Sequence, residues 1–190
     1  TLIEPDFGSI TVKKAVGDGM NIEQYFRMQG GSISISNVQG DGIDVKLTND
    51  PTDEDNGYVF IEAGNIDLQV AADDVKGIKC DNAMTITGGT ITASVSGLGT
   101  KGISTGTDLV ISQAGTTPTL VRMSVTGTTY MPGDADLESK CRGIKVKGNF
   151  TFDGGTIDIA ATGAKAKAIS VDGSYTYISG NINCVVDADK

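Results

Sequence analysis

A short phrase recurs six times along the chain, and this repeat constrains the fold more than any other feature: it reads Gly-Ile in four units, Gly19-Met20 in the first and Ala168-Ile169 in the last. The phrases begin at equivalent positions of successive units: Gly19, Gly42, Gly77, Gly102, Gly143 and Ala168. Gly77 and Gly102 lie 25 residues apart, as do Gly143 and Ala168, which sets the basic period. A self-similar period of this length is typical of proteins that stack one supersecondary unit on the next.

Apolar and polar residues alternate within each unit. In the third unit, for example, Ile78 and Cys80 are followed by Met84 and Ile86. A period of two predicts β-strands with one buried face. Three short strands fill a unit of this length and leave no room for helices. We therefore predict an all-β fold, a single-stranded right-handed parallel β-helix (solenoid) with about six coils of three short strands.

The whole chain, residues 1–190, is predicted to form one β-helix domain. Residues 1–15 contain a strand-like segment, Gly8–Val12, and are expected to form an N-terminal cap or a partial coil. Two units are longer than the others, which predicts inserted loops at about 47–57 and 113–137. Insertions in repeat proteins emerge as loops, often on the working face.

Glycine pairs such as Gly30-Gly31 recur at a fixed distance after the repeated phrase, and we expect them at a bend that needs positive φ. Two units carry Gly64-Asn65 and Gly180-Asn181 instead. Asparagine tolerates positive φ better than most residues. We therefore assign Asn65 and Asn181 to the same special position.

Charge and composition exclude several classes of function. The chain has 24 acidic and 15 basic residues, a net charge of -9, which disfavours nucleic-acid binding. It has no histidine, so no Ser-His-Asp or Cys-His site can form. No apolar run approaches the length of a transmembrane segment. The sequence begins at Thr1 without a visible signal peptide, and we expect a mature or trimmed product.

Three cysteines, Cys80, Cys141 and Cys184, occupy repeat columns that elsewhere hold small or apolar residues. We expect buried, unreactive thiols. No Cys-x-x-Cys pair is present, and with no histidine available a zinc site is not expected.

A column of charged residues precedes the repeated phrase. Asp18 and Asp41 occupy it in the first two units, and the later units carry basic residues: Lys76, Lys101, Arg142 and Lys167. Neighbouring strands lie about 4.8 Å apart, so the basic residues would form a ladder with Lys79 and Lys145 projecting beside it. Such a ladder could bind an acidic polymer, for example a uronic-acid polysaccharide. The alternative is a solvated corner whose long side chains pair with nearby carboxylates.

Clusters of aspartates occur in two places, and their carboxylate oxygens are the ligands that calcium prefers. Asp18 and Asp41 are expected to lie close enough to share a cation. The first inserted loop carries Asp50, Asp53 and Asp55, although it does not follow the EF-hand spacing. The alternative for this loop is a solvated acidic segment without a metal.

Phe60 is the aromatic residue that best fits a surface position. It falls between the inward residues Val59 and Ile61 and should therefore face outward. Together with Tyr58 and Tyr130 it is a candidate for stacking against a sugar ring. The other aromatic residues that fit the inward columns are predicted to lie in the core: Phe26, Phe150, Phe152, Tyr175 and Tyr177.

The phrases GDGI (40–43), VKGIKC (75–80), CRGIKV (141–146) and GGTI (88–91) resemble those of a family of secreted bacterial β-helix carbohydrate-binding proteins. The family is related in fold to pectate lyases, and many members are surface lipoproteins of gut bacteria, some described as adhesins. The resemblance implies binding of plant cell-wall polysaccharides with calcium. It implies calcium ligation only for Asp18 and Asp41, because later units replace this aspartate with lysine or arginine.

We therefore expect a non-catalytic extracellular module for polysaccharide binding or cell adhesion, assisted by calcium and favouring acidic, pectic glycans. The resemblance places it outside the cell or on the cell surface, held by a lipid anchor on a removed N-terminal segment. The first alternative is a polysaccharide lyase of pectate-lyase type, with calcium to acidify the sugar and Arg142 as the base. The second is a structural adhesin that contacts protein. The oligomeric state is left open.

Overall fold

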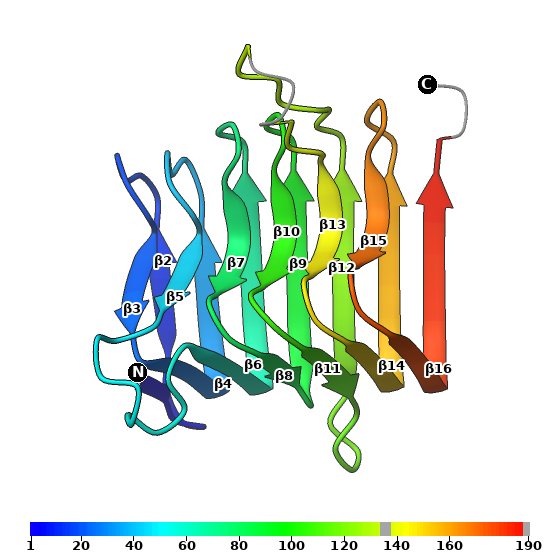
Figure 1. Cartoon of the computed structure of the whole chain (residues 1–190). Coiled ribbons are helices and arrows are strands. Elements are labelled where there is room, and N and C mark those ends of the chain that lie inside the picture. The colour runs from blue at the N-terminus through cyan, green and yellow to red at the C-terminus, as the bar shows by residue number, and fades with distance from the viewer. Residues whose placement is uncertain (134–137, 188–190) are drawn as a thin grey trace.

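The computed structural model describes residues 1–133 and 138–187, and every regular element in this part of the chain is a β-strand (Figure 1). In chain order the strands are β1 (Leu2–Ile3), β2 (Ser9–Val12), β3 (Met20–Glu23), β4 (Tyr25–Ile35), β5 (Ile43–Lys46), β6 (Tyr58–Val70), β7 (Lys76–Cys80), β8 (Met84–Ile86), β9 (Gly89–Val95), β10 (Lys101–Thr105), β11 (Leu109–Ser112), β12 (Thr119–Val125), β13 (Arg142–Val146), β14 (Phe150–Ala161), β15 (Lys167–Val171) and β16 (Tyr175–Val186). The described residues contain no helix that could span a membrane.

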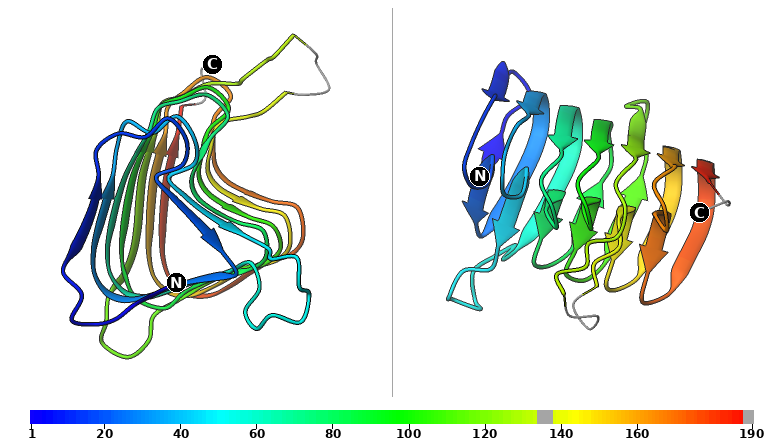
Figure 2. Two further views of the ribbon diagram at one scale, coloured as in Figure 1. Left: turned by 90° about the vertical axis from the view of Figure 1, so that its left-hand side faces the viewer. Right: turned by 90° about the horizontal axis from the view of Figure 1, so that it is seen from above.

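The strands form two parallel sheets. One sheet has six strands in the order β15-β13-β10-β7-β5-β3, and the other has ten. Each strand pairs with its equivalent in the neighbouring repeat, so that Ile78 lies between Ile43 and Ile103. Successive repeats therefore lie side by side along the molecule (Figure 1). Seen along this direction, they outline a roughly triangular section (Figure 2).

The ten-stranded sheet closes on itself. β6 pairs with β8 through residues 59–61 and with β9 through residues 65–70, and β14 likewise pairs with both β11 and β12. The order β6-β8-β11-β14-β12-β9 thus returns to β6 and forms a closed ring of six parallel strands. The predicted fold class, a right-handed parallel β-helix or solenoid with three separate short strands in each coil, is therefore wrong. The chain is all-β, with this closed ring and a separate six-stranded parallel sheet.

Glycines at the bends explain why the strands are longer than predicted. Gly64 and Gly155 have φ of 94° and 88°, a conformation that glycine adopts without strain. β6 and β14 therefore turn the corner as continuous strands. The assignment of Asn65 and Asn181 to this position is wrong, because both lie one residue later and pair with Ser32 and Thr156 in the regular ladder.

The predicted inward residues form one core, which includes Phe26, Phe150 and Phe152 at 0 % exposure. Tyr175 and Tyr177 are 48 % and 54 % exposed, contrary to the prediction. They lie in β16, which pairs with β14 alone, so no further strand of the described chain covers them. The same position explains the cysteines: Cys80 and Cys141 are buried as predicted, whereas Cys184 in β16 is exposed.

The first predicted insertion, residues 47–57, lies between β5 and β6. The second, predicted at 113–137, is divided by β12, because Val121, Met123 and Val125 keep the apolar alternation and are buried. Residues 113–118 and 126–141 therefore form separate connections, and residues 134–137 lie outside the described chain. Near the N-terminus, Ser9–Val12 forms the predicted strand and pairs with β4.

Candidate functional site

Two aromatic rings stand on the outer face of the ten-stranded sheet. Tyr58 and Phe60 alternate in β6 with the buried residues Val59 and Ile61, so both rings point away from the core, as predicted for Phe60. Their centroids are 5.9 Å apart and their planes differ by 7°. The two rings are therefore nearly parallel and form one partly exposed aromatic surface.

Arg27 covers this surface from the neighbouring strand β4. It pairs in register with Phe60, and its guanidinium carbon lies 4.1 Å from the ring centroid. The guanidinium also forms ion pairs with Glu62 and, at 3.5 Å, with Asp55 of the inserted loop. Gln29 donates a hydrogen bond to the second oxygen of Glu62 at 2.8 Å. The two carboxylates thus hold the single guanidinium of Arg27 against the ring.

The strands on the other side of Phe60 carry smaller side chains. Phe60 pairs with Thr85 of β8, and Thr85 pairs with Val110 of β11. The rings therefore rise beside a lower floor on the side away from Arg27. We call this feature the Phe60 step, with Tyr58, Phe60 and Glu62 as its wall and Thr85 and Val110 as its floor.

Inserted loops bound both ends of β8. At one end Asn82 donates a hydrogen bond to the backbone oxygen of Asn56 at 3.1 Å. At the other end Gly88 packs so closely against the Glu62 backbone and the Thr117 methyl group that a Cβ atom would collide with both. The loops 47–57 (cyan) and 113–118 (green) project from the two corners of this face (Figure 2). The Phe60 step therefore lies between two insertions.

The acidic loop is closed by its own side chains. Asp50 accepts hydrogen bonds from the backbone and hydroxyl groups of Thr52 at 2.9 and 2.7 Å, and these bonds lower the pKa of Asp50. Asp53 accepts from the Thr48 hydroxyl at 2.5 Å, and Asp55 pairs with Arg27. These carboxylates are engaged by different partners and do not belong to the one carboxylate group found among the described residues. Calcium ligation by Asp50, Asp53 and Asp55 stays a prediction.

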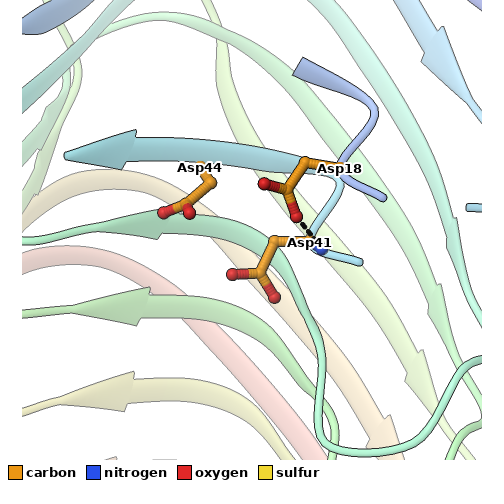
Figure 3. A group of neighbouring side chains, drawn as sticks. All are labelled: Asp18, Asp41 and Asp44. Atoms are coloured by element: carbon orange, nitrogen blue, oxygen red, sulfur yellow. Dashed lines mark hydrogen bonds between the residues drawn. The ribbon is translucent and has the colours of Figure 1, made fainter. Parts of the chain in front are cut away.

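That carboxylate group consists of Asp18, Asp41 and Asp44, which each place an oxygen within 4.8 Å of the others (Figure 3). Asp18 accepts a hydrogen bond from the backbone of Asp41 at 2.8 Å, and Asp41 accepts one from the backbone of Lys76 at 2.7 Å. Each Gly-Asp-Gly aspartate therefore reaches the backbone of the next repeat. Asp44 was missed in the sequence analysis. Its position between the inward residues Ile43 and Val45, three residues after Asp41, was a signal that could have placed its side chain on the same outer face.

The Asp18, Asp41 and Asp44 cluster concentrates negative charge at a partly buried place. Burial raises the pKa of Asp41, and the nearby Asp44 adds to this, while the hydrogen bond and charge of Lys76 oppose it. The Asp44 side chain is 4 % exposed and pairs with Lys79 at 2.9 Å and Lys46 at 3.1 Å. The donor set suits a divalent cation, and binding one would compete with the two lysines for Asp44.

The basic ladder exists as a register. Lys76, Lys101, Arg142 and Lys167 occupy paired positions on successive strands. Lys101, however, is 8 % exposed and donates hydrogen bonds to Asp74, Gly99 and Ser139 at 3.3, 2.8 and 2.5 Å. Burial lowers its pKa. Lys76 also lies 3.8 Å from the Asp74 carboxylate.

The flanking lysines are paired as well. Lys79 contacts Asp44 and, at 3.5 Å, Asp81, and Lys145 pairs with Asp172. Lys167 is exposed and forms no ion pair with the described residues. Four of the six basic side chains are thus held by carboxylates, as in the alternative of a solvated, paired corner. A polyanion-binding role stays a prediction.

Two further candidates lie elsewhere. Arg142, the base of the lyase alternative, donates to the backbone oxygen of Lys140 at 3.2 Å. It is on β13, and β7 and β10 separate it from the Asp18, Asp41 and Asp44 cluster on the β3 and β5 side. Tyr130 forms an antiparallel bridge with Ser139 in the 126–141 connection and does not join the Phe60 step.

Comparison with protein-family models matches residues 3–125 to a family described as "Carbohydrate-binding domain-containing protein". No curated protein and no solved structure matches the chain. The matched segment ends with β12 and contains both the Phe60 step and the Asp18, Asp41 and Asp44 cluster. The ladder residues Arg142 and Lys167 lie outside it.

Proposed function

Because this chain belongs to the carbohydrate-binding domain-containing protein family, we propose that it is a non-catalytic polysaccharide-binding module whose saccharide lies on the Phe60 step. The observation that carries the assignment of this site is the parallel pair of rings, Tyr58 and Phe60, raised beside small side chains and bounded by two inserted loops. We propose an extracellular role, because the plant cell-wall polysaccharides considered as ligands lie outside the cell.

The chemistry of the step suits a sugar ring. A sugar presents an apolar face of C–H groups, which packs on an aromatic surface, and a rim of hydroxyl groups, which needs hydrogen-bonding partners. The rings of Tyr58 and Phe60 supply the first, while the Glu62 carboxylate and the Thr85 hydroxyl supply an acceptor and a donor beside them. The wall and floor would hold the sugar against two surfaces at once.

The first test measures binding of the whole chain to neutral and acidic plant polysaccharides, with calcium and with chelator. Phe60→Ala should weaken binding about tenfold or more, since truncating a central anchor typically costs about 2 kcal/mol. Phe7→Ala is the matched control, because Phe7 is also exposed but lies near the N-terminus. It should bind like the wild type.

Each other outcome has a defined meaning. Equal affinity of the Phe60→Ala and wild-type proteins would remove the Phe60 step from the proposal. Release of unsaturated sugar products would favour the lyase alternative. No binding to any polysaccharide would favour a protein-contacting adhesin.

We also propose that calcium assists binding and that acidic, pectic glycans are preferred. The first is supported by the convergence of Asp18, Asp41 and Asp44 (Figure 3). The second rests on the basic ladder, most of whose side chains are already paired. Comparing acidic with neutral polymers in the same binding experiment tests it directly.

A further inference from the structure

A second surface with the features of a ligand site lies on the adjoining side of the triangular section. It is a groove of about 380 Å³ on the outer face of β6, β9, β12 and β14. The residues that line it include Asp67, Gln69, Thr92, Ser94, Arg122 and Asp158. This volume falls within the range of about 300–1,000 Å³ that is usual for sites that bind small molecules.

The groove follows from the strand register. Thr92 of β9 pairs with Asp67 of β6 on one side and with Arg122 of β12 on the other, and Arg122 pairs with Asp158 of β14. The next outward row has small side chains, with Ser94 beside Ser124. A low floor of hydroxyl and methyl groups is therefore flanked by longer polar side chains at both edges.

The charges at the groove identify a class of ligand. Arg122 lies 3.3 Å from Asp158, and both side chains are about half exposed. Asp67 adds a second carboxylate, so the three charged groups sum to one negative charge. An anionic ligand would meet this negative charge, whereas a neutral ligand with many hydroxyl groups can bond to the carboxylates, to the amide of Gln69 and to the floor hydroxyls.

We propose that this groove is a second saccharide subsite, which takes a neutral glycan and allows one molecule to hold two polysaccharide chains. The inference rests on the proposed function of the Phe60 step and extends it. The two sites lie on faces that meet at the Gly64 bend, and the loop 113–118 projects from the corner between them (Figure 2). That loop separates the two chains.

None of the residues that line the groove is aromatic. The groove therefore lacks the stacking surface of the Phe60 step and should bind more weakly on its own. Because each site takes its own polymer chain, the weaker groove adds a bridge between chains and does not raise the affinity for a single chain.

Isothermal titration of the whole chain with cellohexaose, xylohexaose and mannohexaose tests the proposal. We expect two sites on the wild-type protein for the oligosaccharide that binds. Thr92→Ile, which removes a hydroxyl from the groove floor, should leave one site, as should Phe60→Ala. The double variant should bind none. Wild-type protein should also raise the viscosity of the corresponding polymer, and either single variant should lose this effect.

Thr90→Ile is the matched control, because Thr90 lies two residues earlier on the same face of β9 but does not line the groove. The Thr90→Ile variant should keep both binding sites. Its melting temperature should equal that of the Thr92→Ile variant, so that any loss of a site in Thr92→Ile is not due to lower stability. One site that disappears in Phe60→Ala and is unchanged in Thr92→Ile would overturn the second subsite and leave the Phe60 step intact. No binding of any of the three neutral oligosaccharides to the wild type would overturn the neutral-glycan groove, whereas the Phe60 step is decided separately by the panel of neutral and acidic polysaccharides.

Discussion

The guanidinium of Arg27 lies 4.1 Å from the centre of the Phe60 ring and is held there by Glu62 and Asp55. This arrangement joins three parts of the chain: β4, β6 and the acidic loop. It positions the ring and the loop relative to each other, so the geometry of the Phe60 step depends on a residue that does not face the floor of the step.

Replacing Arg27 should therefore affect both stability and binding. Arg27→Gln removes a cation–π contact and two ion pairs, which together are worth about 1 kcal/mol at such a half-exposed site. Arg27→Lys keeps the charge but loses the flat guanidinium that covers the ring, so it should rescue only part of the affinity. Chemical denaturation and polysaccharide binding check the two effects. Binding by Arg27→Gln at wild-type affinity would show that the ring needs no support from Arg27.

A second prediction concerns Asp74, which ties the 126–141 connection to the body of the protein. Partial burial would raise its pKa, but the hydrogen bond from Ser139 and the charges of Lys76 and Lys101 together lower it below 3.8. Because the folded pKa is the lower one, this stabilisation is present at neutral pH and is lost as the pH falls below about 4. Asp74→Asn should therefore destabilise the protein at pH 7 and have little effect at pH 3.

Thermal melts across this pH range measure the difference. Ser139→Ala, which removes the hydrogen bond that Asp74 accepts at 2.7 Å, should reproduce part of the loss at pH 7. Equal destabilisation by Asp74→Asn at both pH values would mean that packing, and not the charge of Asp74, holds the connection.

The local features of this fold, namely which residues face inward and which share a register, could be predicted from the sequence. The joining of short strands into longer ones could not. The alternation around Phe60 predicted its outward direction, and the column of Lys76 and Lys101 predicted their register. The period could not show that Gly64 lets a strand continue through a bend, because continuity depends on backbone angles. The ring closure follows from that continuity.

The site was predicted only in part for a similar reason. Phe60 could be identified from its position between buried residues. Arg27 and Glu62 could not, because the ion pair between them depends on the direction in which each side chain points. The pairing of Lys101 with Asp74 could not be predicted from spacing. Asp74 lies in the turn before β7, and Lys101 begins the equivalent strand of the next repeat, so the direction of the Lys101 side chain decides whether the two meet. Patterns of spacing reveal which residues share a column, and not which partner neutralises them.

Thiol reactivity gives a third prediction. Burial raises the pKa of Cys80 to about 12, and Cys141 is fully buried, so neither should react with a thiol reagent at pH 8. Cys184 is exposed on β16 and should be modified in the native protein, although partial burial and the nearby Asp158 raise its pKa and slow the reaction. Titration should find one reactive thiol before unfolding and three after. Cys184→Ser should leave none in the native state.

The last prediction separates a calcium site from a cluster of aspartates that needs no metal. If calcium binds Asp18, Asp41 and Asp44, a concentration one hundred times the dissociation constant should stabilise the protein by about 2.7 kcal/mol. For a chain of this size that is a rise of roughly 5–10 °C in melting temperature. Chelator should remove it.

Asp41→Asn should lose the calcium response while keeping the acceptor for the Lys76 backbone. Burial raises the pKa of Asp41, so its charged form is disfavoured in the folded state, and stability without metal falls as the pH rises through this raised pKa. In chelator at pH 7 the variant should therefore melt at or above the wild type, and in calcium below it. Asp6→Asn, at an exposed position near the N-terminus, should respond to calcium like the wild type. Identical wild-type melts in calcium and in chelator would show that Lys46 and Lys79 suffice to balance the cluster.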